Sequence, residues 1–388
     1  MSRVYSHINT ATTILHLYKN EVPFALFIKN FFSKEKKYGS KDRKNISSLC
    51  YNFFRMGNAF KSKTIEQKLL ISIFLFSTEP NDYLEEKKPE WFSHSQLPLE
   101  KKLIFLKLDV TTIFPSKNEI SNSLEAETFC FSFLIQPNLF VRIRLGHQEK
   151  VVSKLNNAQI AYEKINENCF SFSNSTKLDT ILEINKEVVI QDYSSQRTGE
   201  LLAMHQYTYV ADVWDCCAAS GGKSIMAYDL VKNIRLTVSD VRESILQNLK
   251  KRFNEAGIDK YTSFICDLTN PSIIENHLQK KKFDIVICDA PCSGSGTWGR
   301  TPEQLAFFKT KKINQYSKLQ KTIVGNTIPY VKKGGYFVYI TCSVFTKENE
   351  EVVAFIQQNT KLQLIQSNYY KGYTLGADTL FGALFKSV

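Results

Sequence analysis

Residues 211–223 read ADVWDCCAASGGK, a short apolar run that gives way to small residues and a lysine. The pattern predicts a buried strand that turns into a helix, where small side chains let a ligand approach the N–H groups of the helix start. A phosphate-binding P-loop would need glycine six residues before Lys223, and this chain has Cys217 there. The G-x-G-x-x-G spacing of a dinucleotide fold is also missing from this turn. A generic tight turn remains the alternative to a ligand-binding loop.

Further short apolar runs follow, each separated from the next by a helical pattern. This alternation predicts an α/β fold with a mostly parallel, doubly wound sheet. In such a sheet ligands bind outside the carboxyl ends of the strands, so the residues that follow each run are the candidates for function. The runs cover residues 211–216, 235–239, 262–266, 283–288 and 336–340.

Two carboxylates stand at the ends of the second and third runs. Asp240 lies where nucleoside-binding α/β units place an acid that accepts hydrogen bonds from ribose hydroxyls. Asp267 is suitably placed to contact an adenine edge. Helix capping is a competing explanation for both residues, because aspartate is favoured at helix starts.

Two thiols stand at the ends of the fourth and fifth runs. Residues 289–296 read DAPCSGSG, which puts Asp289, Cys292 and a glycine-rich loop together, and residues 341–343 read TCS. A single cysteine is most often a structural, buried thiol. Two cysteines at neighbouring strand ends of one sheet are harder to explain by packing, and they indicate chemistry at this edge.

The chain before residue 190 has a different pattern of apolar and charged residues. Apolar residues recur at helical spacing over residues 1–120, and residues 29–63 contain ten basic and two acidic side chains. This stretch is either a solvated helix surface or a surface that contacts phosphates. Residues 129–187 predict a small α+β module with strands near 140–144 and 181–190 and a helix near 149–155. Arg142 and Arg144 in its first strand are predicted to contact phosphates, or else to be plain exposed residues.

The overall composition excludes several classes of protein. The chain has 388 residues, 43% of them apolar, and a formal net charge of +12, which predicts a folded protein with an anionic partner. Its longest apolar stretch, residues 69–76, is too short to cross a bilayer, and no secretory signal is evident, so we expect a cytoplasmic protein. Nine scattered cysteines without a C-x-x-C pair predict neither a disulfide framework nor a metal site.

The strand-end motifs resemble those of the RsmB-like (Fmu/Sun-type) RNA cytosine-5 methyltransferases, which use S-adenosylmethionine. The similarity covers residues 191–388 and includes the order of the two cysteine motifs; the family usually has proline where this chain has Ser220. Residues 39–55 are similar to the NusB-like RNA-binding domain of bacterial members, and residues 137–187 to their RRM-like subdomain. The motifs that carry the resemblance are residues 217–223, Asp240, Asp267, residues 289–294, residues 339–343 and residues 348–350.

The resemblance implies a role for each candidate residue. Cys342 is implied as the nucleophile, Asp289 as the group that holds the N3 side of the cytosine, and Cys292 as the residue that assists product release. Lys223 is implied to lie near the same ring or thiol. The implied cofactor-binding residues are Cys217, Ala218, Ala219, Ser220, Gly221, Gly222, Lys223, Asp240, Asp267 and Asp289.

The resemblance also implies a Rossmann-like class I methyltransferase core at residues 191–388, preceded by an all-α NusB-like domain at 1–125 and an α+β RRM-like subdomain at 126–190. The implied substrate is RNA, with ribosomal RNA favoured over transfer RNA, and neither a membrane nor an obligate protein partner is expected. Three other activities stay open: an RNA-binding ribosome-assembly factor on a methyltransferase fold, a methyltransferase for protein or small molecules, and a DNA cytosine methyltransferase.

Overall fold

The computed structural model describes residues 3–79, 81–203, 207–231 and 233–388. The chain forms two compact units. Unit 1 comprises Met1–Asn118, Glu125–Gln136 and Trp298–Thr310, and unit 2 comprises Glu119–Leu124, Pro137–Thr297 and Lys311–Val388. The division into three functional domains stays a prediction.

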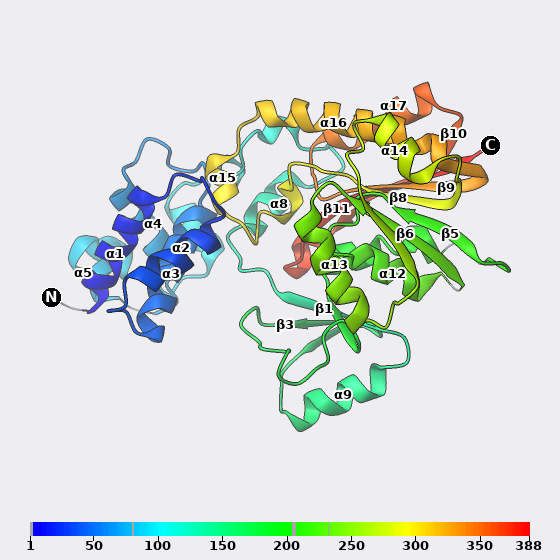
Figure 1. Ribbon diagram of the computed structural model, residues 1–388. Helices are drawn as coiled ribbons and strands as arrows, with labels where there is room; N and C mark the ends of the chain where they lie inside the picture. The colour runs from blue at the N-terminus through cyan, green and yellow to red at the C-terminus, as the bar shows by residue number, and fades with distance from the viewer. Residues whose placement is uncertain (1–2, 80, 204–206, 232) are drawn as a thin grey trace. The chain divides into compact units, whose positions relative to one another are not determined.

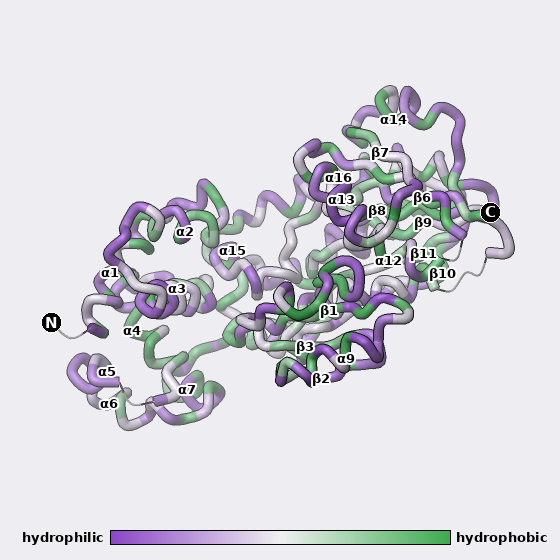
Figure 2. The backbone as a smooth tube through the Cα atoms, turned by 60° about the horizontal axis from the view of Figure 1, so that its bottom comes forward, coloured by the Kyte–Doolittle hydropathy of each residue, from purple (hydrophilic) through white to green (hydrophobic). Residues whose placement is uncertain are grey.

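Unit 1 is helical, as the apolar spacing predicted. Hydrophilic and hydrophobic segments alternate along its helices (Figure 2), whose apolar faces meet in an aromatic core where the rings of Phe24 and Phe54 lie 4.8 Å apart. Thr64 caps α4 through a capping box with Gln67, which satisfies two backbone N–H groups at that helix start. The α-helices are α1 (Arg3–Leu17), α2 (Phe24–Lys34), α3 (Ser40–Arg55), α4 (Ile65–Phe76), α5 (Asp82–Lys87), α6 (Pro89–Phe92), α7 (Leu99–Phe105), α8 (Ala126–Ser132) and α15 (Glu303–Phe307).

The basic stretch at residues 29–63 is mostly solvent-exposed, with one clear exception. Arg55 is buried, and its guanidinium donates hydrogen bonds to the carbonyls of Phe133, Ile135 and Gly299, all within unit 1. Arg55 therefore joins three separate chain segments instead of contacting phosphate. The exposed members are Lys29, Lys34, Lys36, Lys37, Lys41, Lys44, Lys61 and Lys63.

Unit 2 begins with a small antiparallel sheet and one helix, the α+β module expected from the sequence. The sheet has the order β2-β3-β1-β4, and Val151 and Leu155 of α9 (Gln148–Asn157) pack in its core. The strand expected near residues 181–190 is shorter than predicted, since only β4 (Val188–Ile190) pairs in the sheet. The other strands are β1 (Leu139–Ile143), β2 (Glu163–Asn166) and β3 (Cys169–Phe172).

A seven-stranded sheet with the order β10-β11-β9-β8-β5-β6-β7 forms the centre of unit 2 (Figure 1). All five runs predicted from the sequence are strands of this sheet, and they pair in parallel. Two antiparallel strands, β10 and β11, extend it beyond β9 and were not predicted. The strands are β5 (Ala211–Asp215), β6 (Ile234–Asp240), β7 (Tyr261–Ile265), β8 (Phe283–Asp289), β9 (Val331–Thr341), β10 (Leu362–Lys371) and β11 (Thr379–Ser387).

Helices cover both faces of this sheet, as in a doubly wound fold. One face packs against α12 (Gly222–Leu230) and α13 (Glu243–Glu255), and the other against α14 (Pro271–Leu278), α16 (Lys311–Thr327) and α17 (Glu350–Asn359). The chain runs outward from β5 to β7 and then returns to β8 on the other side of β5. The reversal opens a crevice between the carboxyl ends of β5 and β8, where ligands bind in such folds.

Short elements complete the structure. Across the described part of the chain, no helix has both the length and the hydropathy of a membrane span. The remaining helices are α10 (Tyr193–Arg197) and α11 (Glu200–Ala203), and the 3-10 turns are η1 (Val110–Ile113), η2 (Lys117–Glu119), η3 (Ser295–Thr297), η4 (Ile328–Tyr330), η5 (Thr346–Glu348) and η6 (Tyr373–Leu375).

Candidate active site at the carboxyl ends of the strands

A cavity of about 540 Å³ opens at the carboxyl ends of the parallel strands of unit 2. Its size is in the range of small-molecule sites. It extends from the turn after β5 to the two thiols that follow β8 and β9. Its lining consists of Cys216, Cys217, Ala219, Asp240, Val241, Arg242, Cys266, Asp267, Leu268, Thr269, Asp289, Ala290, Pro291, Cys292, Tyr316, Leu319, Ile323 and Cys342.

The turn after β5 is held in a specific backbone conformation. Ala219 has a φ of 47°, and Gly221, which precedes α12, has a φ of 84°. Glycine is favoured at such positive angles, because a side chain there is strained. The Ser220 carbonyl and hydroxyl both accept hydrogen bonds from Arg252, at 3.0 and 2.9 Å. These bonds fix the turn where the resembled family usually has proline.

The two carboxylates predicted to bind a nucleoside both line the cavity. Asp240 is buried and accepts hydrogen bonds from the Ala219 N–H at 3.0 Å and from the N–H and guanidinium of Arg242. Asp267 is exposed and accepts from the N–H and hydroxyl of Thr269. Helix capping does not account for Asp267, since Asn270 caps α14. Asp240 instead connects the turn after β5 to the end of β6.

Lys223 and Asp289 form a close ion pair across the crevice. The Lys223 Nζ lies 2.6 Å from Asp289 Oδ2, and both side chains are largely buried. Burial lowers the pKa of Lys223, but the neighbouring Asp289 carboxylate more than compensates, so that the pKa is raised. The lysine is therefore a cation at neutral pH. The pair brings a fixed positive charge from α12 to the end of β8.

The thiols of Cys292 and Cys342 meet at the other end of the cavity. Their Sγ atoms lie 3.3 Å apart. The contact with Cys342, together with burial, raises the pKa of Cys292. Cys292 is therefore held as a protonated thiol.

Residues of the segment after β9 hold both thiol-bearing loops. Buried Glu348 accepts a hydrogen bond from the Ser293 N–H at 2.8 Å, beside Cys292. The Asn349 side chain accepts a hydrogen bond from the Thr341 hydroxyl and donates one to the Ser343 carbonyl, on either side of Cys342. Burial raises the pKa of Glu348. These polar contacts fix the directions of the two cysteines.

Gly296 allows the loop after Cys292 to lie against two other segments. Its N–H donates to the Cys342 carbonyl at 2.9 Å, and an added Cβ would lie 1.9 Å from the Thr379 carbonyl oxygen. Any other residue would force the loop away from β11 and from Cys342.

The fold brings most of the predicted site residues together. Cys217, Ala219, Asp240, Asp267, Asp289, Cys292 and Cys342 line one cavity, and Lys223 is joined to it through Asp289. Ala218, Ser220, Gly221 and Gly222 shape the turn without lining that cavity. One wall of the cavity was not predicted from the sequence; α16 supplies it through Tyr316, Leu319 and Ile323. A helical pattern follows the fourth run, but nothing local indicates which residues face a cavity.

The prediction that Arg142 and Arg144 contact phosphates was wrong. Arg142 is buried and Arg144 is largely buried, and both bind Asp229, with closest distances of 2.6 and 2.8 Å. Arg144 also donates to the carbonyls of Asn185 and Ala256. The two arginines therefore join β1 to α12 inside unit 2.

Comparison with known proteins identifies relatives of the α/β part of the chain. Residues 201–381 match the family model described as 16S rRNA methyltransferase RsmB/F. Ribosomal RNA small subunit methyltransferase B of Proteus mirabilis is 32% identical over 183 residues, which are 47% of this chain and 41% of that protein. The probable ribosomal RNA small subunit methyltransferase B of Bacillus subtilis is 30% identical over 240 residues, 60% of this chain and 52% of that protein. The chain thus matches about half or less of the length of these relatives.

Solved structures share the fold. The crystal structure of PH0851 superposes with a TM-score of 0.74 at 20% identity and covers 100% of both chains. NSun6 from Pyrococcus horikoshii, crystallised with SFG, gives a TM-score of 0.60 at 14% identity and covers 71% of this chain and 99% of its own. At sequence identities of 20% and 14%, the similarity to these two structures shows a shared fold and nothing more.

Proposed function

We propose that the protein transfers a methyl group from S-adenosylmethionine to carbon 5 of a cytosine in RNA, because residues 201–381 match the family model described as 16S rRNA methyltransferase RsmB/F. The observation that carries the proposal is the continuity of the cavity, which joins the turn after β5 to the thiols of Cys292 and Cys342. A methyl donor in the turn and a base at the thiols would then share one space.

The lining of the cavity fits S-adenosylmethionine, which supplies an electrophilic methyl group when bound. The Asp240 carboxylate suits the ribose hydroxyls once the exposed Arg242 side chain moves off it. Leu268, Leu319 and Ile323 provide apolar walls for an adenine, with Asp267 at its rim. The cavity lining is therefore polar where the ribose would lie and apolar where the adenine would lie.

Cys342 is the proposed nucleophile. Carbon 5 of cytosine is too weakly nucleophilic to attack a methyl donor unaided, and addition of a thiolate at carbon 6 makes carbon 5 reactive. Asp289 would hold the N3 side of the ring, and the Lys223 cation beside it would stabilise the negative charge that develops there. The addition would form the bond from Cys342 Sγ to carbon 6 and break the π bond between carbons 5 and 6. The freed electron pair would then take the methyl group, with S-adenosylhomocysteine as the leaving group.

Cys292 is the proposed release residue. After methylation, loss of the proton at carbon 5 expels the Cys342 thiolate and restores the aromatic ring. The Cys292 sulfur lies 3.3 Å from that of Cys342, so it is close to the bond that must break. A raised pKa makes the thiolate of Cys292 a strong base, so once Cys292 has lost its own proton to solvent it can take the proton from carbon 5 as the bond from carbon 6 to Cys342 breaks.

The proposed substrate is ribosomal RNA of the small subunit, the RNA in the names of the relatives. The target base must leave its stack to reach the cavity, which costs a few kcal/mol and is easiest in loops and single strands. The exposed lysines of residues 29–63 would neutralise phosphates of the bound RNA. Transfer RNA is the alternative substrate.

The test is methyl transfer from labelled S-adenosylmethionine to purified small-subunit ribosomal RNA, with transfer RNA in a parallel reaction. We expect labelled 5-methylcytidine in the ribosomal RNA digest with the wild-type protein and none with Cys342→Ala. Label in another nucleoside would contradict the cytosine assignment. RNA binding without any label would favour an assembly factor.

A further inference from the structure

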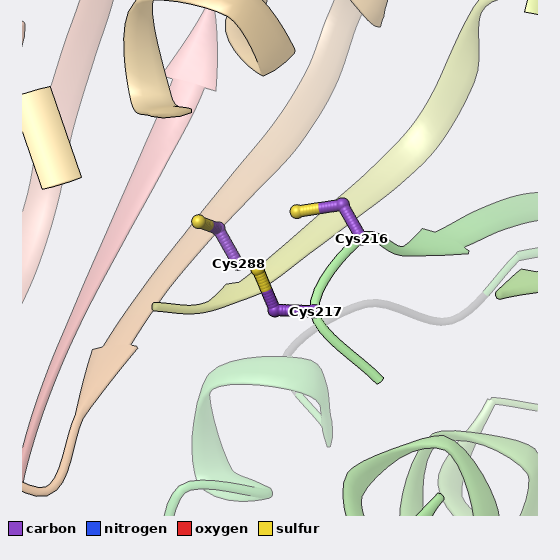
Figure 3. Close-up of side chains that lie close together, drawn as sticks. All are labelled: Cys216, Cys217 and Cys288. Atoms are coloured by element: carbon purple, nitrogen blue, oxygen red, sulfur yellow. The ribbon is translucent and has the colours of Figure 1, made fainter. Parts of the chain in front are cut away.

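Three thiols converge beside the cavity, apart from the pair at its far end. The Sγ atoms of Cys216, Cys217 and Cys288 all lie within 4.8 Å of one another (Figure 3). Cys216 and Cys288 are fully buried, and Cys217 is partly buried. The proposed methyl transfer uses neither Cys216 nor Cys288.

The parallel register of the sheet produces this cluster. Asp215 of β5 pairs with Ile287 of β8, and the Cys216 N–H donates to the Ile287 carbonyl at 2.9 Å. Cys216 and Cys288 are the next residues along each strand. Side chains alternate between the faces of a sheet, so these two thiols lie side by side on the face that packs on α14, α16 and α17.

Cys217 completes the cluster because the chain leaves β5 at this point. Its side chain lines the cavity, and its thiol turns back toward the other two (Figure 3). The position of the third thiol thus depends on the fixed turn that Asp240 and Arg252 hold through Ala219 and Ser220.

Three cysteine sulfurs at this spacing can act together, because each binds a metal ion as a thiolate once its proton is lost.

We propose that Cys216, Cys217 and Cys288 form a binding site for one thiophilic metal ion of the Zn²⁺ type. Three thiolates bound at 2.3 Å around a tetrahedral ion lie roughly 3.8 Å from one another. The Sγ atoms lie at most 4.8 Å apart, so each sulfur–sulfur distance has to shorten by at most about 1 Å on binding. Binding replaces the S–H bonds of the three cysteines by three sulfur–metal bonds and releases their protons to solvent.

The fourth position of the ion faces the cavity. In the described part of the chain no histidine, aspartate or glutamate joins the three cysteines at this spacing. Cys216 and Cys217 both line the cavity, from which a water can reach the ion. Three protein ligands with one open position are a common zinc arrangement. The ion would also tie the turn after β5 to the end of β8.

Equilibrium titration of the reduced full chain with Zn²⁺ against a chromophoric chelator tests the proposal. We expect one ion per chain in the wild type and affinity more than about 100-fold weaker in Cys288→Val and Cys216→Ala. Cys130→Ala, a buried thiol of unit 1, and Cys292→Ser, from the other thiol pair, should keep the wild-type affinity. Wild-type affinity in Cys288→Val, loss of the ion in Cys292→Ser, or no binding in the wild type would each overturn the proposal.

X-ray absorption of the zinc-loaded wild type gives a test that does not depend on a variant folding. We expect a first shell with three sulfur neighbours near 2.3 Å. A shell of nitrogen and oxygen, or one with two sulfurs, would show that the ion is bound elsewhere and overturn the assignment.

Discussion

Cys292 and Cys342 lie 50 residues apart in sequence, and their Sγ atoms are 3.3 Å apart. They follow adjacent parallel strands, β8 and β9, whose ends meet at one edge of the sheet. Two sulfurs at this distance cannot both lose their protons without strong repulsion. The geometry therefore favours different roles for them, one as thiolate and one as proton carrier.

Substitution of the two cysteines should separate these roles. We expect Cys342→Ala to abolish methyl transfer while cofactor affinity stays within about threefold of the wild type, because the carbon–sulfur bond cannot form. Cys292→Ala should accumulate protein covalently joined to RNA, seen as a slow band on a denaturing gel. Turnover by Cys342→Ala would contradict the assignment of the nucleophile. Cys130→Ala is the matched control and should behave as wild type.

Removal of the Lys223 cation should slow chemistry more than binding. In Lys223→Met the Asp289 carboxylate loses the partner that lies 2.6 Å away, so charge development on the base is no longer stabilised. We expect the single-turnover rate to fall about 100-fold. Lys332→Met removes an ion pair with Asp212 and Asp284 at the opposite end of the strands and should leave the rate unchanged. An equal effect of both variants would indicate a purely structural role for Lys223.

Loss of Asp229 should destabilise unit 2. Its carboxylate binds both Arg142 and Arg144, and all three side chains are at most 12% exposed. Asp229→Ala leaves two buried cations without a counter-charge, which costs about 3–5 kcal/mol in the free energy of unfolding. Urea denaturation measures the loss. Glu167→Gln, which breaks an exposed ion pair, should change stability by less than about 1 kcal/mol.

Asp215 should make stability depend on pH. Burial raises its pKa to about 7, from 3.8 in a free side chain. Between about pH 4 and 7 the folded state therefore binds a proton that the unfolded state has lost, so stability falls as pH rises. Relative to Asp215→Asn, the wild type should lose about 4 kcal/mol across this window. Denaturation of both proteins at several pH values measures the difference, and a constant difference would show that Asp215 is ionised in the fold.

The exposed lysines of α3 should contribute to RNA binding. Lys41→Glu combined with Lys44→Glu should weaken binding at low salt and make the dependence of affinity on salt shallower by about one unit per lost contact. Filter binding at several salt concentrations measures both quantities. Lys164→Glu combined with Lys177→Glu, at two exposed lysines of unit 2, makes the same change in charge and is the matched control. Equal effects of the two changes would indicate non-specific attraction.

The central strands could be predicted from the sequence for a physical reason. Parallel strands are buried on both faces and appear as short apolar runs, and their carboxyl ends then identify the candidate site. Strand β10 escaped prediction because exposed and half-buried residues mix along its interior, without a continuous apolar run. The partner of Arg142 and Arg144 also escaped, since Asp229 is 85 residues or more away along the chain. Cys216 and Cys288 are joined only by the register of the sheet.

The segment Trp298–Thr310 has a consequence for the order of folding. It lies within the sequence of the α/β core but packs in unit 1, where the Trp298 ring stacks on Phe114 and Arg55 binds the Gly299 carbonyl. During synthesis the helical unit therefore cannot reach its final packing until residue 310 has left the ribosome, after strands β1 to β8 have emerged. A fragment that ends before this segment would lack part of its own core.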